Sequence, residues 1–384
     1  MHPVVLDLNS SDGSPDIVHR AVQALAEDQV VILPTETVYG IAANACSESA
    51  VAKLIEAKGR QAGHPLALAV KSSDDALDYV PDLSAVGQRL ARRCWPGPLT
   101  LVLNDSHEDS LITRLPESVR QAVVPNGTVG LRVPANEAVL SILRLSRGPL
   151  VLTSANKTGD AETYTAEAAL DSLEGKVDLV LDGGPSKYSQ ASSVVKLQGN
   201  SVQVLREGVI NHSALQRFSS YLVLLVCTGN TCRSPMAEAL MRKRVSNLLA
   251  CGSEEIEQNG VMIMSAGIAA MSGGCSAPEA SAAMHGRGLD LSQHETQPLT
   301  DRLVRFADLI VTMTRGHRDA IVTNWPEAAD RVQLLCRDSS DVSDPIGGSQ
   351  MLYEECANQI DQNLELLLQE LSLPAVLCAG ITGT

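Results

Sequence analysis

The sequence predicts an α/β protein with two domains. Its 384 residues exceed the usual length of one domain. Short apolar runs that fit buried strands alternate with segments of helical periodicity in both halves. Hydrophobic residues make up 44% of the chain and charged residues 20%, a balance typical of a globular protein. We place the first domain at 1–212, a short polar linker at 213–220 and the second domain at 221–384.

The first domain contains many short elements in mixed order. Strand-like apolar runs often end at Pro, Gly or Asp residues that begin turns. A last pair of runs, 194–197 and 202–205, predicts a hairpin across Gly199 and Asn200. The other expected strands are 30–33, 66–70, 99–103, 128–133, 150–152 and 177–181, and the expected helices are 47–57 and 138–145.

The second domain begins with a continuous apolar run at 221–226, which predicts a buried strand. A polar loop follows, and Ser234-Pro235 is a typical start of a helix. Backbone N–H groups of a loop between a strand and a helix converge, and the helix dipole adds partial positive charge. The arrangement therefore predicts a cradle for a phosphate-sized anion.

Cys227 and Arg233 enclose this loop, with five residues between them. The positive field of the cradle favours the thiolate form of a cysteine. The planar guanidinium of Arg233 can bind two phosphoryl oxygens at once. No second pair of Cys or His residues follows at zinc-binding spacing, so the pattern favours a cysteine-dependent phosphatase over a metal site.

Residues 221–373 resemble the low-molecular-weight protein tyrosine phosphatases. The resemblance is carried by the motif at 226–239, by Ser265-Ala266-Gly267, by 307–313 and by Asp344-Pro345. It implies a four-stranded parallel sheet with helices on both faces. It also implies that Cys227 attacks phosphorus to form a phosphocysteine, that Arg233 stabilises the equatorial oxygens and that Asp344 acts as acid and then base. The remaining phosphate-loop residues are then Thr228, Gly229, Asn230, Thr231, Cys232 and Ser234, with Ser234 bonded to the thiolate.

The substrate of this domain is a choice between phosphoarginine and phosphotyrosine in proteins. The loop sequence Gly-Asn-Thr-Cys-Arg-Ser-Pro resembles that of bacterial protein-arginine phosphatases, whereas Ile346 stands where those enzymes have phenylalanine. No aromatic residue follows Pro345 directly to stack on a phenol ring. We therefore expect faster cleavage of phosphoarginine. The rival interpretation, a thiol-dependent arsenate reductase, needs paired relay cysteines, but Cys275, Cys336 and Cys356 are scattered.

The first domain has neither a Walker loop nor a Gly-x-Gly-x-x-Gly turn. Its polar clusters instead lie at the ends of predicted strands and helices, where α/β proteins build their sites. The clusters are 34–40, Lys58-Gly59-Arg60, 95–100 and Ser154-Ala155-Asn156. Two cations separated by one residue can bind a polyphosphate, and a Ser-x-Asn turn adds hydroxyl and amide donors.

In this order the clusters resemble the threonylcarbamoyl-AMP synthases of the TsaC/YrdC family, over essentially all of 1–212. The resemblance implies a twisted mixed sheet. It also implies synthesis of threonylcarbamoyl-AMP from L-threonine, bicarbonate and ATP, with Mg²⁺ bridging the phosphates and no dedicated metal site in the protein. Other proteins then transfer the group to tRNA. The implied nucleotide-binding residues are Lys58, Arg60, Thr128, Ser154, Asn156 and Arg206, and the implied threonine-binding residues are Thr35, Arg132 and Ser192.

Three positions depart from the family pattern. After Asp182 the family usually has Gly-x-Glu-Ser-Thr-Val-Val, whereas residues 189–195 lack that glycine and that acid, with Ala191 in place of the glutamate. Ala69 replaces a frequent histidine, and Glu162-Thr163-Tyr164 replaces the usual Ser-Pro-Thr. An alternative is therefore a non-catalytic domain that senses a nucleotide or amino acid and regulates the phosphatase.

The charge and cysteine content limit the partners and the location. A net charge of −15 disfavours nonspecific binding to nucleic acid, which agrees with an indirect role in tRNA modification. Nine cysteines at irregular spacing favour reduced thiols. The N-terminus lacks a secretory signal pattern, and no apolar run approaches the about 20 residues of a membrane helix. We therefore expect a cytoplasmic protein.

Overall fold

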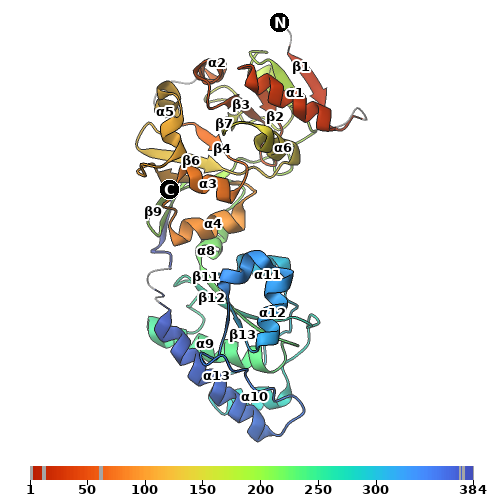
Figure 1. Cartoon of the computed structure of the whole chain (residues 1–384), viewed down its shortest axis with the longest axis vertical. Coiled ribbons are helices and arrows are strands. Elements are labelled where there is room, and N and C mark those ends of the chain that lie inside the picture. The colour runs from red at the N-terminus through yellow and green to blue at the C-terminus, as the bar shows by residue number, and fades with distance from the viewer. Residues whose placement is uncertain (1–2, 11–13, 60–63, 372, 374–376, 384) are drawn as a thin grey trace. The chain divides into compact units, whose positions relative to one another are not determined.

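The computed structural model describes residues 3–10, 14–59, 64–371, 373 and 377–383. It divides into two compact units (Figure 1). Unit 1 extends to Phe218 and also includes the segment that begins at Ala379, and unit 2 is Ser219–Cys378. Both boundaries differ from the expected ones. The expected linker lies largely within helix α8 (His212–Ser219), and the C-terminal segment joins unit 1 instead of unit 2.

Unit 1 contains a mixed sheet of eleven strands among the described residues, in the order β1-β8-β2-β3-β7-β4-β6-β5-β9-β10-β15. The pairs β2–β3, β3–β7, β4–β7, β5–β6 and β9–β10 are antiparallel, and the other neighbours are parallel. The predicted mixed sheet is confirmed. The strands are β1 (Val4–Asp7), β2 (Val31–Leu33), β3 (Gly40–Asn44), β4 (Ala67–Ala69), β5 (Leu99–Asn104), β6 (Thr128–Arg132), β7 (Leu150–Ser154), β8 (Leu179–Asp182), β9 (Ser193–Gln198), β10 (Ser201–Arg206) and β15 (Ile381–Thr382).

Short helices connect these strands, and several begin at side-chain caps. Ser47 accepts a hydrogen bond from the backbone N–H of Ala50, and Asn136 accepts one from Val139. Helices α1 and α6 pack together with β2 and β8 in one core cluster. The helices are α1 (Ser14–Ala26), α2 (Glu48–Lys58), α3 (Ser73–Tyr79), α4 (Ala85–Cys94), α5 (Glu117–Val123), α6 (Glu137–Leu145), α7 (Ala166–Ser172) and the 3₁₀ helix η1 (Leu111–Arg114).

Unit 2 has a four-stranded sheet in the order β12-β11-β13-β14, with all described pairs parallel, as predicted. Its elements are the strands β11 (Tyr221–Cys227), β12 (Val261–Gly267), β13 (Leu309–Thr312) and β14 (Val332–Leu334), the helices α9 (Arg233–Leu249), α10 (Pro278–His285), α11 (Asp301–Phe306), α12 (Arg315–Asn324) and α13 (Gln350–Glu370), and the 3₁₀ helix η2 (Pro326–Arg331).

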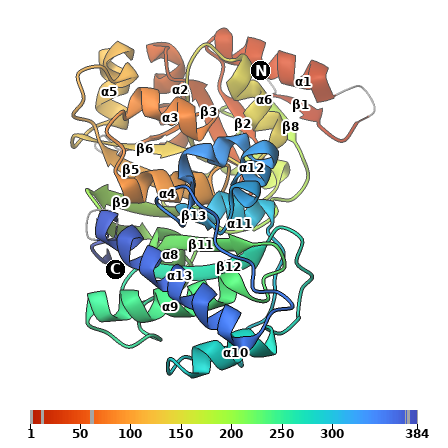
Figure 2. The same ribbon diagram turned by 60° about the horizontal axis from the view of Figure 1, so that its bottom comes forward.

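Strand β11 is buried on both faces, which explains its uninterrupted apolar sequence. Its odd-numbered residues pack in a cluster with α9, α10 and α13, and its even-numbered residues pack with α11 and α12. Figure 2 shows the two groups of helices on opposite faces of this sheet. The end of β11 is therefore fixed between two layers of helices.

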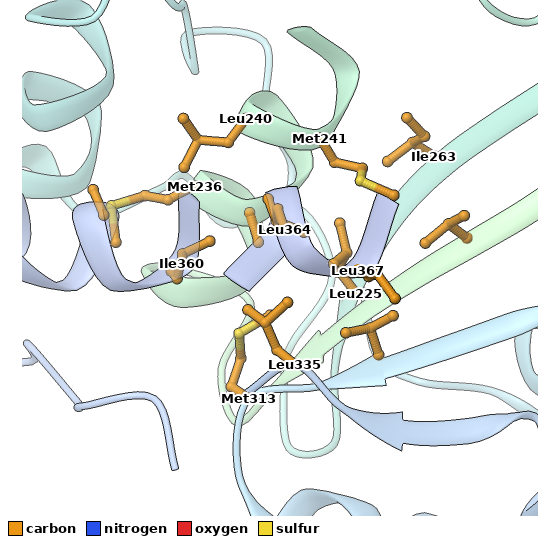
Figure 3. Packing of buried hydrophobic residues seen from close by; sticks show 14 of the residues in the cluster. Leu225, Met236, Leu240, Met241, Ile263, Met313, Leu335, Ile360, Leu364 and Leu367 are labelled. Carbon is orange, nitrogen blue, oxygen red and sulfur yellow. The ribbon is translucent and has the colours of Figure 1, made fainter. Parts of the chain in front are cut away.

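Helix α13 closes the larger of these clusters (Figure 3). Ile360, Leu364 and Leu367 recur at helical spacing and lie in the same cluster as Leu225 of the central strand. Among the described residues, no helix combines the length and apolar character needed to cross a lipid bilayer.

Replacement of Leu364 by Ala is expected to destabilise unit 2 by about 2–5 kcal/mol, because it leaves a cavity beneath α13. Leu366→Ala is the matched control, since Leu366 lies on the same helix but is 46% exposed, and it should change stability by less than about 0.5 kcal/mol. Hydrogen exchange of the β11 amides measures the difference. Equal protection in the two variants would contradict this packing.

Candidate active sites

The loop between β11 and α9 is built around Asn230. This residue has the left-handed φ of 56° that asparagine tolerates better than most residues. Its side-chain amide donates to Ser234 Oγ at 3.0 Å and to Ser265 Oγ at 2.9 Å, and its backbone N–H donates to Cys227 Sγ at 3.3 Å. Asn230 thus turns the loop and directs an N–H group at the sulfur.

A second layer of contacts holds Asn230 itself. Its backbone carbonyl oxygen lies 2.8 Å from His294 Nε2, and its side-chain oxygen accepts from the Gln297 backbone N–H at 2.9 Å. The loop also lies directly against Gly267, where an added Cβ would lie 2.5 Å from the Thr228 carbonyl oxygen. Only glycine fits this position, which explains the Ser-Ala-Gly motif.

Cys227 lies at the centre of the loop and is 3% exposed. Ser234 Oγ lies 3.0 Å from its sulfur, so the predicted serine contact is present. Helix α9 begins at Arg233, and its first N–H groups therefore lie beside the same sulfur-containing loop. The structure brings together the residues that the motif predicted at this position.

Arg233 and Asp344 form an ion pair across the site. Arg233 donates to Asp344 Oδ2 at 2.6 Å, and its side chain is 6% exposed whereas that of Asp344 is 47% exposed. The backbone N–H of Ile346 donates to the other carboxylate oxygen at 3.3 Å. The predicted acid and the predicted arginine, 111 residues apart in sequence, therefore meet.

His317 is a buried neighbour of the loop that the motif did not indicate. Its Nε2 lies 2.9 Å from Thr228 Oγ1. Burial, and then the positive charge of Arg233, lower the pKa of His317 to about 4, against smaller opposing effects of Asp344 and Asp341. The imidazole is therefore neutral near pH 7. No local pattern at 314–318 could have revealed this contact, because it joins segments distant in sequence.

Tyr353 is buried against Cys232 of the loop. The ring is 2% exposed, and its hydroxyl lies 3.5 Å from Cys232 Sγ. Burial and this hydrogen bond raise the pKa of Tyr353. The Thr231 hydroxyl also lies 3.5 Å from the same sulfur. Thr231 and Tyr353 therefore both contact Cys232, and the buried ring of Tyr353 is unavailable for stacking on a substrate.

Unit 1 contains a pocket with a cavity volume of about 460 Å³. Strands β5, β6 and β7 contribute to its wall, together with β9 and β10 and the segment before β3. Predicted site residues from five separate parts of the sequence line it. They are Thr35, Thr128, Arg132, Ser154, Ser192 and Arg206.

Arg132 is held in the pocket by a buried carboxylate. It donates to Glu36 Oε1 at 2.7 Å and to Thr37 Oγ1 at 2.9 Å. The second oxygen of Glu36 accepts from the backbone N–H of Ala135 at 2.9 Å. Thr35 Oγ1 donates to the Val38 carbonyl oxygen at 2.6 Å, which fixes the adjacent turn. Glu36 was not among the predicted site residues, although it lies within a predicted polar cluster.

Arg206 is the second arginine of the pocket. Its Nε and one terminal nitrogen donate to the Ser192 carbonyl oxygen at 3.1 and 2.8 Å, and that nitrogen also lies 3.2 Å from Ser192 Oγ. The other terminal nitrogen lies 3.9 Å from Glu162 Oε1. Burial lowers the pKa of Arg206, an effect that Glu162 opposes and Arg132 reinforces.

Lys58, Ser154 and Asn156 also lie together. Lys58 Nζ donates to the backbone carbonyl oxygens of Ser154 at 2.6 Å and Asn156 at 2.8 Å, and lies 3.5 Å from Ser154 Oγ. The Asn156 amide nitrogen donates to two carbonyl oxygens, which leaves its buried Oδ1 without a hydrogen-bond partner. Arg60, the fourth predicted member, is outside the described residues.

The positions that depart from the family pattern also surround this pocket. Ala69, Ala191 and Glu162 all line it. Asp182 instead accepts a hydrogen bond from the Tyr39 hydroxyl at 3.2 Å. Within the described residues, His, Cys, Asp and Glu side chains do not gather in groups of three that could hold a metal ion.

Two family models match this chain in the two regions that carry these sites. A model of the Sua5, YciO and YrdC proteins, described as "Telomere recombination", matches residues 23–208. A model described as "Low molecular weight phosphotyrosine protein phosphatase" matches residues 222–374.

Individual relatives agree with this division. A putative threonylcarbamoyl-AMP synthase of Mycobacterium tuberculosis is 36% identical over 191 residues, which are 50% of this chain and 83% of the relative. A protein-arginine-phosphatase of Bacillus subtilis is 34% identical over 153 residues, 39% of this chain and 95% of the relative. A threonylcarbamoyl-AMP synthase of Pyrococcus abyssi is 36% identical over 193 residues, half of this chain and 54% of the relative.

This chain thus spans only about half the length of that Pyrococcus relative. The solved structure of a Pyrococcus abyssi Sua5 variant has a TM-score of 0.50 at 21% identity, and covers 86% of this chain and 98% of the solved one, which is a likeness of fold alone. The chain therefore belongs to two families, the Sua5/YciO/YrdC family through unit 1 and the low-molecular-weight phosphotyrosine protein phosphatase family through unit 2.

Proposed function

We propose that this chain carries two enzyme activities, a phosphoprotein phosphatase in unit 2 and a threonylcarbamoyl-AMP synthase in unit 1. The phosphatase is supported above all by the contact of the Asn230 N–H and the Ser234 hydroxyl with Cys227 Sγ, beside the Arg233–Asp344 pair. The synthase is supported by one pocket that gathers predicted threonine-binding and nucleotide-binding residues from distant segments.

In the phosphatase, Cys227 Sγ attacks phosphorus as the bond from phosphorus to the leaving group breaks, which gives a phosphocysteine. The loop N–H groups and Arg233 stabilise the negative charge on the equatorial oxygens. Asp344 gives its proton to the leaving group, and then accepts one from the water that releases phosphate. When the phosphoryl group binds Arg233, it replaces Asp344 in the 2.6 Å ion pair, and the released carboxylate takes up the proton that it then gives to the leaving group.

We further propose that phosphoarginine is the better substrate. A phenol ring needs a flat aromatic wall, but Tyr353 lies buried against Cys232 of the loop. The acid loop instead presents Ile346, which is 70% exposed. An aliphatic side chain suits the flexible methylene arm of an arginine. The B. subtilis relative is named a protein-arginine-phosphatase, which agrees with this assignment.

The arsenate reductase alternative is disfavoured by the state of two of its required thiols. Burial raises the pKa of Cys356 to about 12, and burial also raises the pKa of Cys336. Such thiols are poor nucleophiles near neutral pH. Cys275 is exposed, but a relay needs a second reactive partner.

In the synthase, the amine of threonine and bicarbonate first form a carbamate with loss of one water molecule. A carbamate oxygen then attacks the α-phosphorus of ATP as the bond from that phosphorus to pyrophosphate breaks. Both reactants are anions, so the site must neutralise charge and align them. Arg132 binds the threonine carboxylate and remains oriented by Glu36. Arg206 and Thr128 bind the nucleotide, and Lys58, Ser154 and Arg60 are assigned to its phosphates.

Mg²⁺ would enter with ATP, bound mainly by the phosphates, and would neutralise their charge. The residues fit this ion to a limited extent, since Asn156 Oδ1 is a buried oxygen without a hydrogen-bond partner, and oxygen is the ligand Mg²⁺ prefers. We propose that tRNA is reached only through the proteins that use the product. Nine cysteines at irregular spacing agree with our proposal of a cytoplasmic location.

The alternative for unit 1 is a sensor domain that binds ATP or threonine but does not catalyse a reaction. Its basis is the loss of the family glutamate at Ala191 and of the histidine at Ala69, both of which line the pocket. Against it, two of the three predicted arginines, Arg132 and Arg206, and all four predicted hydroxyl residues line the pocket. Measurement of pyrophosphate release from ATP separates the synthase from the sensor.

Phosphatase assays with a phosphoarginine and a phosphotyrosine peptide of equal sequence should show a higher kcat/KM for phosphoarginine. Thr231→Ile should shift the ratio toward phosphotyrosine by roughly ten-fold, because it adds apolar surface at the loop opening. Cys227→Ser should abolish both activities. Thr323→Ile, at an exposed position of α12, should leave the ratio unchanged. A wild-type ratio at or below one would refute the phosphoarginine assignment.

Pyrophosphate release from ATP by the full chain should require both L-threonine and bicarbonate. Arg132→Lys should raise the KM for threonine about ten-fold, because lysine keeps the charge beside Glu36 but loses the planar fork. Arg144→Lys, at the exposed end of α6, is the control. ATP binding without threonine-dependent release would favour the sensor over the enzyme.

His317→Gln should flatten the pH dependence of unit 2 stability between about pH 6.5 and pH 4. The unfolded chain binds a proton to His317 below its ordinary pKa, whereas the folded chain does so only near its lowered pKa of about 4. Stability from this group is therefore complete above the ordinary value and lost as the pH falls toward 4. Urea unfolding at several pH values measures it. His285→Gln, at an exposed site, is the control, and an unchanged slope in His317→Gln contradicts the assignment.

A further inference from the structure

The two residues before Asp344 are anchored through all of their backbone hydrogen-bonding groups. Val342 is 2% exposed and belongs to the core cluster that α13 closes. Its N–H donates to the Met313 carbonyl oxygen at 2.8 Å, and its carbonyl oxygen accepts from Arg233 at 3.4 Å. The N–H and carbonyl groups of Ser343 also have partners. Four consecutive backbone groups are thus fixed directly before the proposed acid.

Helix α13 supplies both partners of Ser343. Gln359 Oε1 accepts from the Ser343 N–H at 3.1 Å, and Cys356 Sγ donates to the Ser343 carbonyl oxygen at 3.4 Å. Burial raises the pKa of Cys356 to about 12, so this thiol keeps the proton that it donates. The amide nitrogen of Gln359 donates to the Asp341 carbonyl oxygen at 3.2 Å. One side chain therefore spans Val342 and holds the backbone on both sides of it.

The side chain of Asp341 connects the same segment to α12. Its Oδ1 accepts from the backbone N–H of Arg315, the first residue of that helix, at 2.8 Å, and Arg315 Nε lies 3.3 Å from the same oxygen. The backbone bond to Arg315 lowers the pKa of Asp341, as suits a carboxylate at a helix N-terminus. Helices α12 and α13 lie on opposite faces of the unit 2 sheet (Figure 2), so the segment is fixed to both layers.

The anchored segment ends where the exposed part of the acid loop begins. The Asp344 side chain is 47% exposed, and Ile346 is 70% exposed. One terminal nitrogen of Arg233 binds Asp344 Oδ2, while the other binds the Val342 carbonyl oxygen. A general acid has to come within hydrogen-bond distance of the atom that it protonates. The place of its backbone therefore decides whether it can act, and a small displacement is costly.

We propose that Gln359 is a positioning residue for Asp344. Its amide fixes the backbone at Asp341 and Ser343, and so sets the point from which the acid reaches the leaving group. This inference rests on the proposed role of Asp344 as general acid. The step that depends on Gln359 is the transfer of a proton from Asp344 to the leaving group as its bond to phosphorus breaks. Stabilisation of the phosphoryl oxygens by Arg233 and the loop is independent of it.

Two aryl phosphates test this role in the full chain, because they differ in their need for the acid. Phenolate leaves poorly without a proton, whereas dinitrophenolate is a stable anion and needs none. The ratio kcat/KM reports the steps up to formation of the phosphocysteine, in which the leaving group departs.

Gln359→Met keeps the length of the side chain but removes both of its hydrogen bonds to the segment. It should lower kcat/KM for phenyl phosphate about ten-fold, because two hydrogen bonds that hold the acid are lost. It should leave kcat/KM for dinitrophenyl phosphate unchanged. A merely structural role would lower both values together.

A matched control and a double variant complete the test. Gln362→Met, at an exposed position of the same helix, should change neither value. Asp344→Asn removes the acid and should lower kcat/KM for phenyl phosphate about a hundred-fold. In that background Gln359→Met should cause no further loss, because Gln359 acts through the acid. An equal loss in both backgrounds, an equal loss for the two substrates, or wild-type values in Gln359→Met would overturn the positioning role.

The Asp344→Asn variant separates this inference from the proposed acid. If Asp344→Asn selectively impairs phenyl phosphate cleavage and Gln359→Met does not, the acid stands and the role of Gln359 fails. If Asp344→Asn affects the two substrates equally, the acid assignment itself fails. Hydrogen exchange of the Ser343 amide then still tests the anchor, since Gln359→Met should accelerate it about ten-fold. Unchanged exchange in that variant would contradict the anchor.

Discussion

A guanidinium cannot lose its charge inside a protein, and this constraint shapes both candidate sites. Three arginines of these sites, among the described residues, each face a carboxylate from a distant segment, and the side chains of Arg132 and Arg233 are largely buried. The pairs are Arg233–Asp344, Arg132–Glu36 and Arg206–Glu162. An anionic substrate must therefore approach a cation that already has a partner. The acid sets the orientation of the arginine and reduces the net positive charge of the site when no substrate is bound.

The two units use this constraint differently under the proposed mechanisms. In unit 2 the partner is exposed enough to move, and it is also the group that exchanges protons in the reaction. A phosphoryl group that binds Arg233 displaces Asp344 from the guanidinium. Asp344 then becomes available to protonate the leaving group. In unit 1 Glu36 is fixed by a backbone N–H as well as by Arg132, so this acid stays in place and the arginine keeps one orientation throughout.

The sequence predicted features formed by a single segment of the chain, and it missed contacts between segments that are distant in sequence. The phosphate loop lies within a single segment, and its residues lie where the motif indicated. The parallel sheet followed from buried runs such as β11. Strand β1 was missed because it is mostly exposed, and β3 because small residues give little apolar pattern. Glu162 and His317 contact partners that only the folded chain brings near.

The position of strand β15 determines when the unit 1 sheet can be completed during synthesis of the chain. Ile381 and Thr382 pair in parallel with β10, the strand that ends at Arg206, although all of unit 2 separates the two in sequence. During translation the edge of β10 therefore emerges long before its neighbour does. A nascent chain has to keep that edge open, or shield it, while the phosphatase fold is still being made, and an unpaired edge is a site of aggregation. A chain interrupted after residue 218 would retain that liability permanently.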